Sequence, residues 1–144
     1  MVKDKERENQ LAFKAGQYFD NRITSVFWSS FKGEMGRIQA AVLVFLYDHK
    51  NCRINDIADE LNVPKQHISK IVIGFIRDGL AESGKDETDK RAAVVALTEK
   101  GNSLIKEHYE KSSDHFQSLL AGMKPEDRKQ FIKALETIER LLRV

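Results

Sequence analysis

One stretch constrains the fold of this chain more than any other: RINDIADELNVPKQHISKIVIGFIRDGL, between Arg53 and Leu80. It opens with apolar residues at helical steps over about two turns, at Ile57, Ala58 and Leu61. Asn55 suits the N-cap of this short helix, because its side chain can accept a hydrogen bond from a free first-turn amide. Asn62 tolerates the left-handed backbone that ends a helix, and Pro64 suits the first position of the next one. The stretch therefore predicts two helices joined by a very short turn.

The second of these helices is predicted to be amphipathic, with Gly79 as its natural stop. Its buried stripe consists of Ile68, Ile71, Val72, Phe75 and Ile76. The seventeen residues from Leu61 to Arg77 contain three bases and no acid, whereas the acids of this region lie on the preceding helix. A short helix, a tight turn and a basic second helix form the pattern of a helix-turn-helix, whose second helix enters the major groove of DNA.

The first turns of the second helix carry the candidate DNA contacts. They are Lys65, Gln66, His67, Ser69 and Lys70. Lysine and serine bind phosphate, and glutamine, lysine and histidine can read base edges. The helical pattern alone fits equally well a plain solvated face of an amphipathic helix, and on this pattern both interpretations stay open.

A small β-hairpin is predicted after the helix-turn-helix. Its strands are LAES and AAVVAL, and the charged loop KDETDKR lies between them. Thr98 suits the N-cap of a further helix, with Glu99 in its first turn. The fold class expected is mainly α with a small β-hairpin wing, a winged helix-turn-helix domain flanked by long helices.

The sequence LNVPKQHISKIVIGFIRDGL…DETDKRAAVVALTEKG resembles the multiple-antibiotic-resistance regulator (MarR) family of winged-helix transcription factors. That family has a G-L strand start, here Gly79 and Leu80, and a wing of D-x-x-D-x-R type. The wing residues here are Asp86, Asp89 and Arg91, and the second strand ends in the motif L-T-x-x-G, here LTEKG from Leu97 to Gly101. The resemblance covers essentially the whole chain, and its specific part is the stretch from the wing to LTEKG.

The resemblance implies roles for three wing residues. Arg91 matches the arginine that reaches the minor groove, where a narrow groove concentrates negative potential. Asp89 matches the acid that braces this arginine, because a carboxylate can orient a guanidinium through paired hydrogen bonds. Lys90 is expected to face phosphate. The alternative is that the loop is only a solvated turn.

The recognition helix departs from the family pattern at several positions. Gly74 lies in its middle, where the family usually has a longer residue, and Ile73 adds an apolar group on a side expected to be wet. Gln66 and His67 replace the small hydroxyl residues common in the family. These departures concern the operator sequence and leave the fold as predicted.

The helices on either side of this region are predicted at 8–32, 98–122 and 126–143, with a buried helix at 37–48. Their length and apolar content exceed the needs of one compact domain, and they are expected to pair with a second copy of the chain. This gives an N-terminal dimerisation helix (1–34), a winged helix-turn-helix region (35–98) and C-terminal dimerisation helices (99–144), intertwined as one domain. The alternative is a monomer with its helices folded back.

An effector pocket is a further expectation, because small ligands in the family often bind where the dimer helices meet the winged-helix region. Its candidate lining is Tyr18, Phe27, Trp28, Phe31 and Tyr109. An aromatic stripe at helical spacing also fits plain core. Cys52 raises oxidant sensing as another alternative, with Lys50 and Arg53 as cationic neighbours, against a structural thiol.

Composition excludes several classes of protein. The net charge of +2 is uninformative, the single cysteine excludes an internal disulfide, and no run approaches a membrane span. No phosphate loop, nucleophile elbow, paired catalytic carboxylates, metal site or cofactor motif is found, so an enzyme is not expected. The motifs, their spacing and the resemblance together predict a cytoplasmic homodimer that binds double-stranded operator DNA as a repressor and is released by a small aromatic or apolar effector. The alternatives are a winged-helix module that contacts protein and an oxidant-sensing regulator that acts through Cys52.

Overall fold

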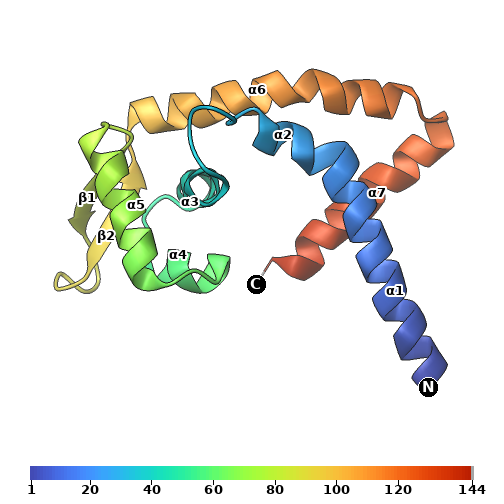
Figure 1. The fold of residues 1–144 in the computed structure, drawn as a ribbon, viewed down its shortest axis with the longest axis horizontal. Coiled ribbons are helices and arrows are strands. Elements are labelled where there is room, and N and C mark those ends of the chain that lie inside the picture. The colour runs from blue at the N-terminus through green and yellow to red at the C-terminus, as the bar shows by residue number, and fades with distance from the viewer. Residues whose placement is uncertain (144) are drawn as a thin grey trace.

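The computed structural model describes residues 1–143. Its elements are α1 (Val2–Phe19), a π-helical turn η1 (Asp20–Thr24), α2 (Ser25–Ser29), α3 (Arg37–Asp48), α4 (Ile54–Leu61), α5 (Lys65–Arg77), β1 (Ala81–Lys85), β2 (Ala93–Leu97), α6 (Glu99–Ala121) and α7 (Pro125–Leu142). Figure 1 shows α3, α4, α5 and the hairpin gathered at one end of the molecule, with α6 leading away to α7 at the other. The predicted fold class, mainly helical with a small hairpin wing, is confirmed.

The first helical segment is longer than its apolar pattern predicted. It begins at Val2 and runs through α1, η1 and α2 to Ser29, with the π-helical turn η1 after the 18 residues of α1. A π turn inserts one extra residue and widens the helix locally. Gly33, with a φ of 89°, lies in the turn that separates this segment from α3.

The core of the winged-helix body forms around α3, whose predicted bounds are confirmed. The side chains that it buries are Ala40, Val42, Leu43 and Leu46. They pack with apolar residues of the neighbouring helices and strands, including Ile57, Ile68, Val72, Phe75, Val95, Leu97 and Ile105. This single cluster fixes α4, α5 and the hairpin relative to one another.

The turn between α4 and α5 follows the sequence prediction closely. Asn62 takes the left-handed conformation, with a φ of 51°, and the Val63 amide donates to the Ala58 carbonyl over 3.1 Å to close the end of α4. Pro64 is the N-cap of α5, one residue before the predicted position. The predicted N-cap of α4 was wrong: the cap is Arg53, whose amide donates to the Asp56 carboxylate over 3.1 Å.

The wing is an antiparallel pair in which Ala81 lies opposite Leu97 and Lys85 opposite Ala93. Cys52 extends this sheet by one bridge, because its amide and carbonyl both bond to the backbone of Val95, over 3.0 and 2.7 Å. The segment between α3 and α4 is therefore fixed to the inner edge of the hairpin.

The end of the hairpin joins α6 through two residues of the LTEKG motif. The Thr98 hydroxyl accepts from the Gly101 amide over 3.2 Å, as its predicted capping role requires. A Cβ atom on Gly101 would lie 2.1 Å from the Leu80 carbonyl oxygen. Only glycine allows this close approach of α6 to the start of β1.

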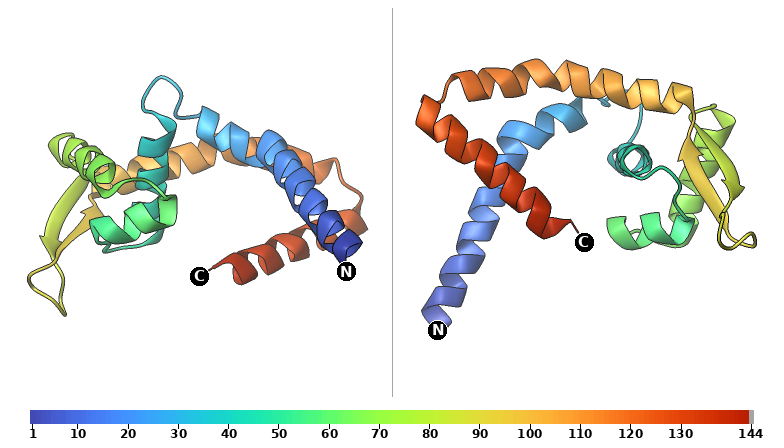
Figure 2. Two further views of the ribbon diagram at one scale, coloured as in Figure 1. Left: turned by 60° about the horizontal axis from the view of Figure 1, so that its bottom comes forward. Right: turned by 180° about the vertical axis from the view of Figure 1, so that it is seen from behind.

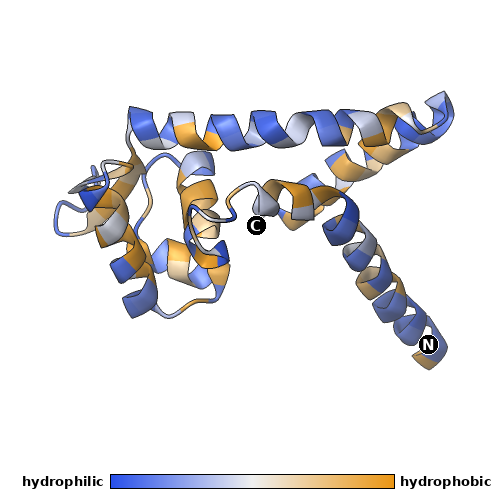
Figure 3. Cartoon of the chain, turned by 45° about the horizontal axis from the view of Figure 1, so that its top comes forward, coloured by the Kyte–Doolittle hydropathy of each residue, from blue (hydrophilic) through white to orange (hydrophobic). Residues whose placement is uncertain are grey.

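The two terminal helices project from the body and expose apolar side chains. Neither α1 nor α7 buries a single residue. Phe13 is 78% exposed and Leu141 is 65% exposed. Figures 2 and 3 show both helices standing clear of the winged-helix body, with apolar residues on their surfaces. The alternative of terminal helices folded back onto the body does not match this arrangement.

Candidate DNA-binding surface

The outward face of α5 lies opposite its buried stripe. Ile68, Ile71, Val72 and Phe75 are buried against the core. The opposite stripe, at steps of four, three and four residues, is Gln66, Lys70, Ile73 and Arg77, and all four are exposed. Of the predicted contacts, Lys65, Gln66, His67 and Lys70 are exposed, whereas Ser69 is half-buried at the edge of this face.

These side chains are free of partners inside the molecule. Within residues 1–143, no side chain among Lys65, Gln66, His67, Ser69 and Lys70 forms a hydrogen bond or an ion pair. Between Leu61 and Arg77 the chain carries three cations and no acid. Arg77, at the C-terminal end of this face, donates to the Asp78 carboxylate over 3.3 Å. The earlier turns of the face therefore combine positive charge with unused hydrogen-bonding groups, which is what a phosphate backbone and base edges require.

The C-terminal end of α5 is held by residues from the start of α6. The Thr98 hydroxyl donates to the Gly79 carbonyl over 2.6 Å, and the Lys100 ammonium donates to the Asp78 carbonyl over 2.9 Å. A lysine at this end of a helix also complements the helix dipole. The direction of α5 relative to the wing is thus fixed at the point where the hairpin begins (Figure 1).

The wing loop is organised around Asp86. One of its carboxylate oxygens accepts from the Arg53 guanidinium, with Nε at 3.1 Å and Nη2 at 2.8 Å. The other accepts from the amide and the hydroxyl of Thr88, at 2.9 and 2.8 Å. The Arg53 guanidinium, followed by these Thr88 bonds, holds the pKa of Asp86 far below its usual range. The sequence comparison identified Asp86 as a motif acid but missed its partner, which lies in the cap of α4.

Asp89 braces the wing differently from the prediction. Its carboxylate accepts from the backbone amide of Arg91 over 3.1 Å, and its carbonyl accepts from the Ala92 amide over 2.9 Å. Within the described residues it makes no ion pair with the Arg91 guanidinium. The physical reason is that a short Asp side chain readily bonds its own backbone two residues on. Lys90 and Arg91 are both exposed at the tip of the wing.

The five predicted effector residues do not line one pocket in the described chain. The ring of Phe27 stacks on that of Tyr109 at 4.8 Å. Phe31 is buried and stacks on His108 at 3.7 Å. Tyr18 is 53% exposed on α1, beside Arg22. These contacts make Phe27, Phe31 and Tyr109 part of the packing of α2 and the turn after it against α6.

Trp28 does line a pocket, of about 450 Å³, between α2, α3 and the end of α4. The guanidinium carbon of Arg37 lies 3.4 Å from the centre of the Trp28 ring. The remaining lining residues are Ile38, Ala41, Val44, Phe45, Asp48, His49, Glu60, Leu61 and Val63. Burial raises the pKa of Asp48 and lowers that of Arg37. The pocket is mainly apolar with a charged rim, the usual character of a small-molecule site.

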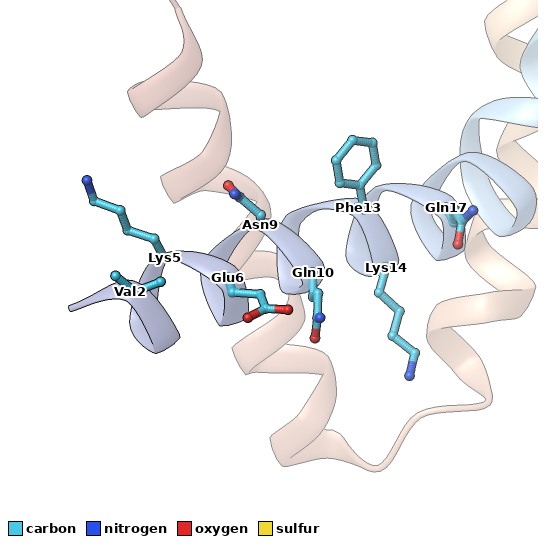
Figure 4. Close-up of a pocket in the computed structure, with 8 residues that line it drawn as sticks. All are labelled: Val2, Lys5, Glu6, Asn9, Gln10, Phe13, Lys14 and Gln17. Carbon is cyan, nitrogen blue, oxygen red and sulfur yellow. The ribbon is translucent and has the colours of Figure 1, made fainter.

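A second hollow, of about 700 Å³, follows the exposed surface of α1 and is lined by that helix alone. Figure 4 shows its residues standing along one helix, with Phe13 among polar side chains. It lies far from α5 and the wing in the chain fold (Figure 1). A surface of this kind is an open helix flank rather than an enclosed ligand site.

Cys52 is buried, with 3% of its surface exposed. Its thiol donates to the His49 carbonyl over 3.1 Å. Burial, with a smaller contribution from Asp56, raises the pKa of the thiol to about 11. The reactive form of a cysteine is the thiolate, so this environment favours the structural interpretation over oxidant sensing.

Neither a metal site nor a membrane span is indicated in the described part of the chain. Residues 1–143 hold no cluster of three or more His, Cys, Asp or Glu side chains placed to bind a metal ion. Among the same residues, no helix combines the length and the apolar character needed to cross a membrane.

Residues 34–92 match the sequence model of the MarR family. Two curated relatives from Bacillus subtilis are similar to the chain: the uncharacterised HTH-type transcriptional regulator YfiV, 25% identical over 77% of the chain, and the HTH-type transcriptional repressor YetL, 26% identical over 69%. The matches span 69% and 62% of these relatives, about two thirds of their lengths.

Three solved structures share the fold. A MarR transcriptional regulator from Methanosarcina mazei has a TM-score of 0.67 at 21% identity, covering 91% of this chain and 95% of that one. FabT of Streptococcus pneumoniae in complex with DNA has a TM-score of 0.67 at 17% identity, with 94% and 96% covered. Bordetella bronchiseptica BpsR, whose structure concerns regulation of DNA binding by 6-hydroxynicotinic acid, has a TM-score of 0.59 at 21% identity, with 91% of each chain covered.

Proposed function

We propose that the chain is a MarR-family homodimeric repressor that binds operator DNA and is released by a small aromatic or apolar effector. The match of residues 34–92 to the family model and the similarity to HTH-type transcriptional regulators support this proposal. The observation that carries the proposal is the outward face of α5, which is exposed and whose Gln66 and Lys70 side chains make no hydrogen bond or ion pair within the described residues. In this proposal Lys65, Gln66, His67, Ser69 and Lys70 engage the major groove and its phosphates, and Lys90 and Arg91 engage the minor groove and backbone beside it.

The wing supports the DNA part of this proposal. Asp86 and Asp89 spend their hydrogen-bonding capacity on Arg53 and on the loop backbone. Within the described residues, Lys90 and Arg91 at the tip form no ion pair with the acids of their own loop. An arginine presented in this way suits the negative potential of a narrow minor groove.

The dimer is proposed from the exposed apolar faces of the projecting helices. Residues 1–34 and 99–144 would pair across a twofold axis, and residues 35–98 would form the DNA-binding region. Two recognition helices in such a dimer lie roughly 34 Å apart, one turn of DNA. Sedimentation of the full chain should give twice the mass of one chain, and replacing Leu141 by Lys should shift it toward the monomer.

The effector is proposed to enter the pocket beside Trp28. Its apolar walls suit an aromatic ring, and the Arg37 guanidinium at the rim suits an anionic or polar substituent. In the related BpsR, DNA binding is regulated by 6-hydroxynicotinic acid, and the relative YetL is named a repressor. Quenching of the single tryptophan gives a direct readout for ligand screening.

A winged-helix module that contacts protein is the second candidate, and the exposed Ile73 is the observation that favours it. A gel shift separates the two. Duplex from upstream of the protein's own gene should bind more tightly than random duplex, and the binding should weaken steeply with salt. Equal affinity for both duplexes would contradict the regulator and favour the module.

A further inference from the structure

The outward face of α5 carries one apolar side chain among polar ones. Ile73 is 66% exposed. It lies one turn from Lys70 and Arg77 and two turns from Gln66, so the four side chains leave the helix in nearly the same direction. Ile73 therefore lies at the centre of the face that the proposed function places in the major groove.

Gly74, the next residue, has no explanation inside the molecule. A Cβ atom at this position would meet only the flexible Arg77 guanidinium, at an ordinary 3.8 Å. Its φ is not in the left-handed region, which among the glycines is reached by Gly33 and Gly79. Glycine in a helix interior lowers stability relative to alanine. A glycine that the described chain does not require is consistent with a close approach by something outside the chain.

The chemistry of the face indicates what approaches it. A protein partner would be expected to contact a broader apolar cluster, but the other exposed apolar residue of α5, Ile76, is turned about 60° away and is only 39% exposed. The neighbours of Ile73 on its own stripe are two cations and an amide, with no acid between Leu61 and Arg77. On the edges of DNA bases in the major groove, the apolar group is the 5-methyl of thymine.

We propose that Ile73 contacts a thymine methyl group in each operator half-site, and that Gly74 lets the backbone of α5 approach the base edges closely enough for this contact. The inference rests on the proposed DNA-binding function and deepens it. The operator should then carry a thymine opposite Ile73, which lies in the last turn but one of α5. Ile73 would thus determine part of the sequence specificity.

The test begins with duplex selected by the full-length chain from a random-sequence pool. Each thymine of the selected site is then replaced in turn by uracil, which removes only the 5-methyl group. The affinity of each duplex is measured for the wild-type chain, for Ile73→Ala and for Ile76→Ala, a matched control on the same helix. Both isoleucines are exposed, and circular dichroism confirms that each variant is folded.

We expect one thymine per half-site at which uracil lowers the affinity about four-fold, the effect of leaving one methyl group in water. This loss should vanish in Ile73→Ala and persist in Ile76→Ala. If no thymine is sensitive, or if the loss has the same size in Ile73→Ala, the inference is overturned while the DNA-binding function stands. If selection yields no preferred sequence, the proposed function itself fails, and a protein contact for Ile73 is favoured.

Gly74→Ala provides an independent arm. We expect this variant to melt at a higher temperature than the wild type and yet to bind the selected duplex more weakly, because the added methyl group separates α5 from the base edges. A stabilised variant with unchanged or tighter binding would overturn the close approach.

Discussion

The guanidinium of Arg53, in the cap of α4, donates two hydrogen bonds to one carboxylate oxygen of Asp86, at the base of the wing loop, over 3.1 and 2.8 Å. This pair connects two parts of the proposed DNA-binding surface that are 33 residues apart in the chain. The Asp86 side chain is 20% exposed and that of Arg53 is 41% exposed. The same Asp86 orders the loop through Thr88, so one carboxylate sets both the position and the shape of the wing.

Asp86→Asn should therefore weaken DNA binding without unfolding the protein. The amide keeps the size of the side chain but loses the charge that attracts Arg53 and one acceptor of the loop bonds. We expect a several-fold loss of affinity for operator DNA and faster exchange of the Thr88 amide hydrogen. Glu87→Gln, an exposed change of the same kind at the next position, should leave both quantities unchanged. Equal effects in the two variants would contradict the bracing role.

The pH dependence of this brace has a defined sign. The pKa of Asp86 is lower in the folded chain than its usual value of 3.8, so the pair stabilises the fold fully above that pH. Its contribution declines as pH falls below 3.8 and is lost only below the folded pKa. The difference in stability between wild type and Asp86→Asn should accordingly be constant near neutrality and shrink in acid. A stability difference between wild type and Asp86→Asn that grows as the pH falls would contradict the stabilising role of the pair.

Gly101→Ala should destabilise the protein strongly. The new Cβ would lie 2.1 Å from the Leu80 carbonyl oxygen, a backbone atom that cannot move without displacing β1. Overpacking of this kind costs about 2 kcal/mol or more. Thermal unfolding gives the comparison, with Gly84→Ala as the control, because a Cβ there would meet a Val94 methyl group at an ordinary 3.7 Å. Similar melting temperatures for the two variants would show that α6 does not pack as described.

Cys52 should react slowly with thiol reagents in the folded protein. Its thiol is buried and its pKa is raised to about 11, so the thiolate is scarce near neutral pH. Labelling at pH 8 should be slow before denaturation and rapid after it. In cells, Cys52→Ser should leave a peroxide response unaltered. Rapid labelling of Cys52 in the native chain would instead support the alternative that this residue senses oxidants.

Residues whose local chemistry determines backbone conformation were predictable from the sequence. Asn62 takes the left-handed turn, Gly79 ends α5, and Thr98 caps α6, because each outcome depends on neighbours within a few residues. The winged helix-turn-helix region follows from helical periodicity together with the resemblance of the stretch from the wing to LTEKG to the MarR family. These features position most of the proposed DNA contacts.

The features that escaped prediction depend on contacts between distant segments or on a choice between adjacent groups. Arg53 and Asp86 meet beside the bridge through which Cys52 joins the wing sheet. Arg37 covers Trp28 across a turn, which places Trp28 in a pocket and leaves Phe27, Phe31 and Tyr109 in the packing. At the start of α4, Arg53 rather than Asn55 is the N-cap, and its amide donates to the Asp56 carboxylate. The Asp89 carboxylate accepts from the Arg91 backbone amide and makes no bond to the Arg91 guanidinium within the described residues.

The central claim is that α5 and the wing tip bind DNA through their exposed cations. The most direct measurement is the salt dependence of operator binding for the wild type and for the double variant Lys70→Ala/Arg91→Ala. Loss of two cationic contacts should lower the affinity and make the dependence of log affinity on log salt concentration less steep, by about one for each phosphate contact removed. An unchanged affinity with an unchanged slope would contradict the DNA-binding surface described for this chain.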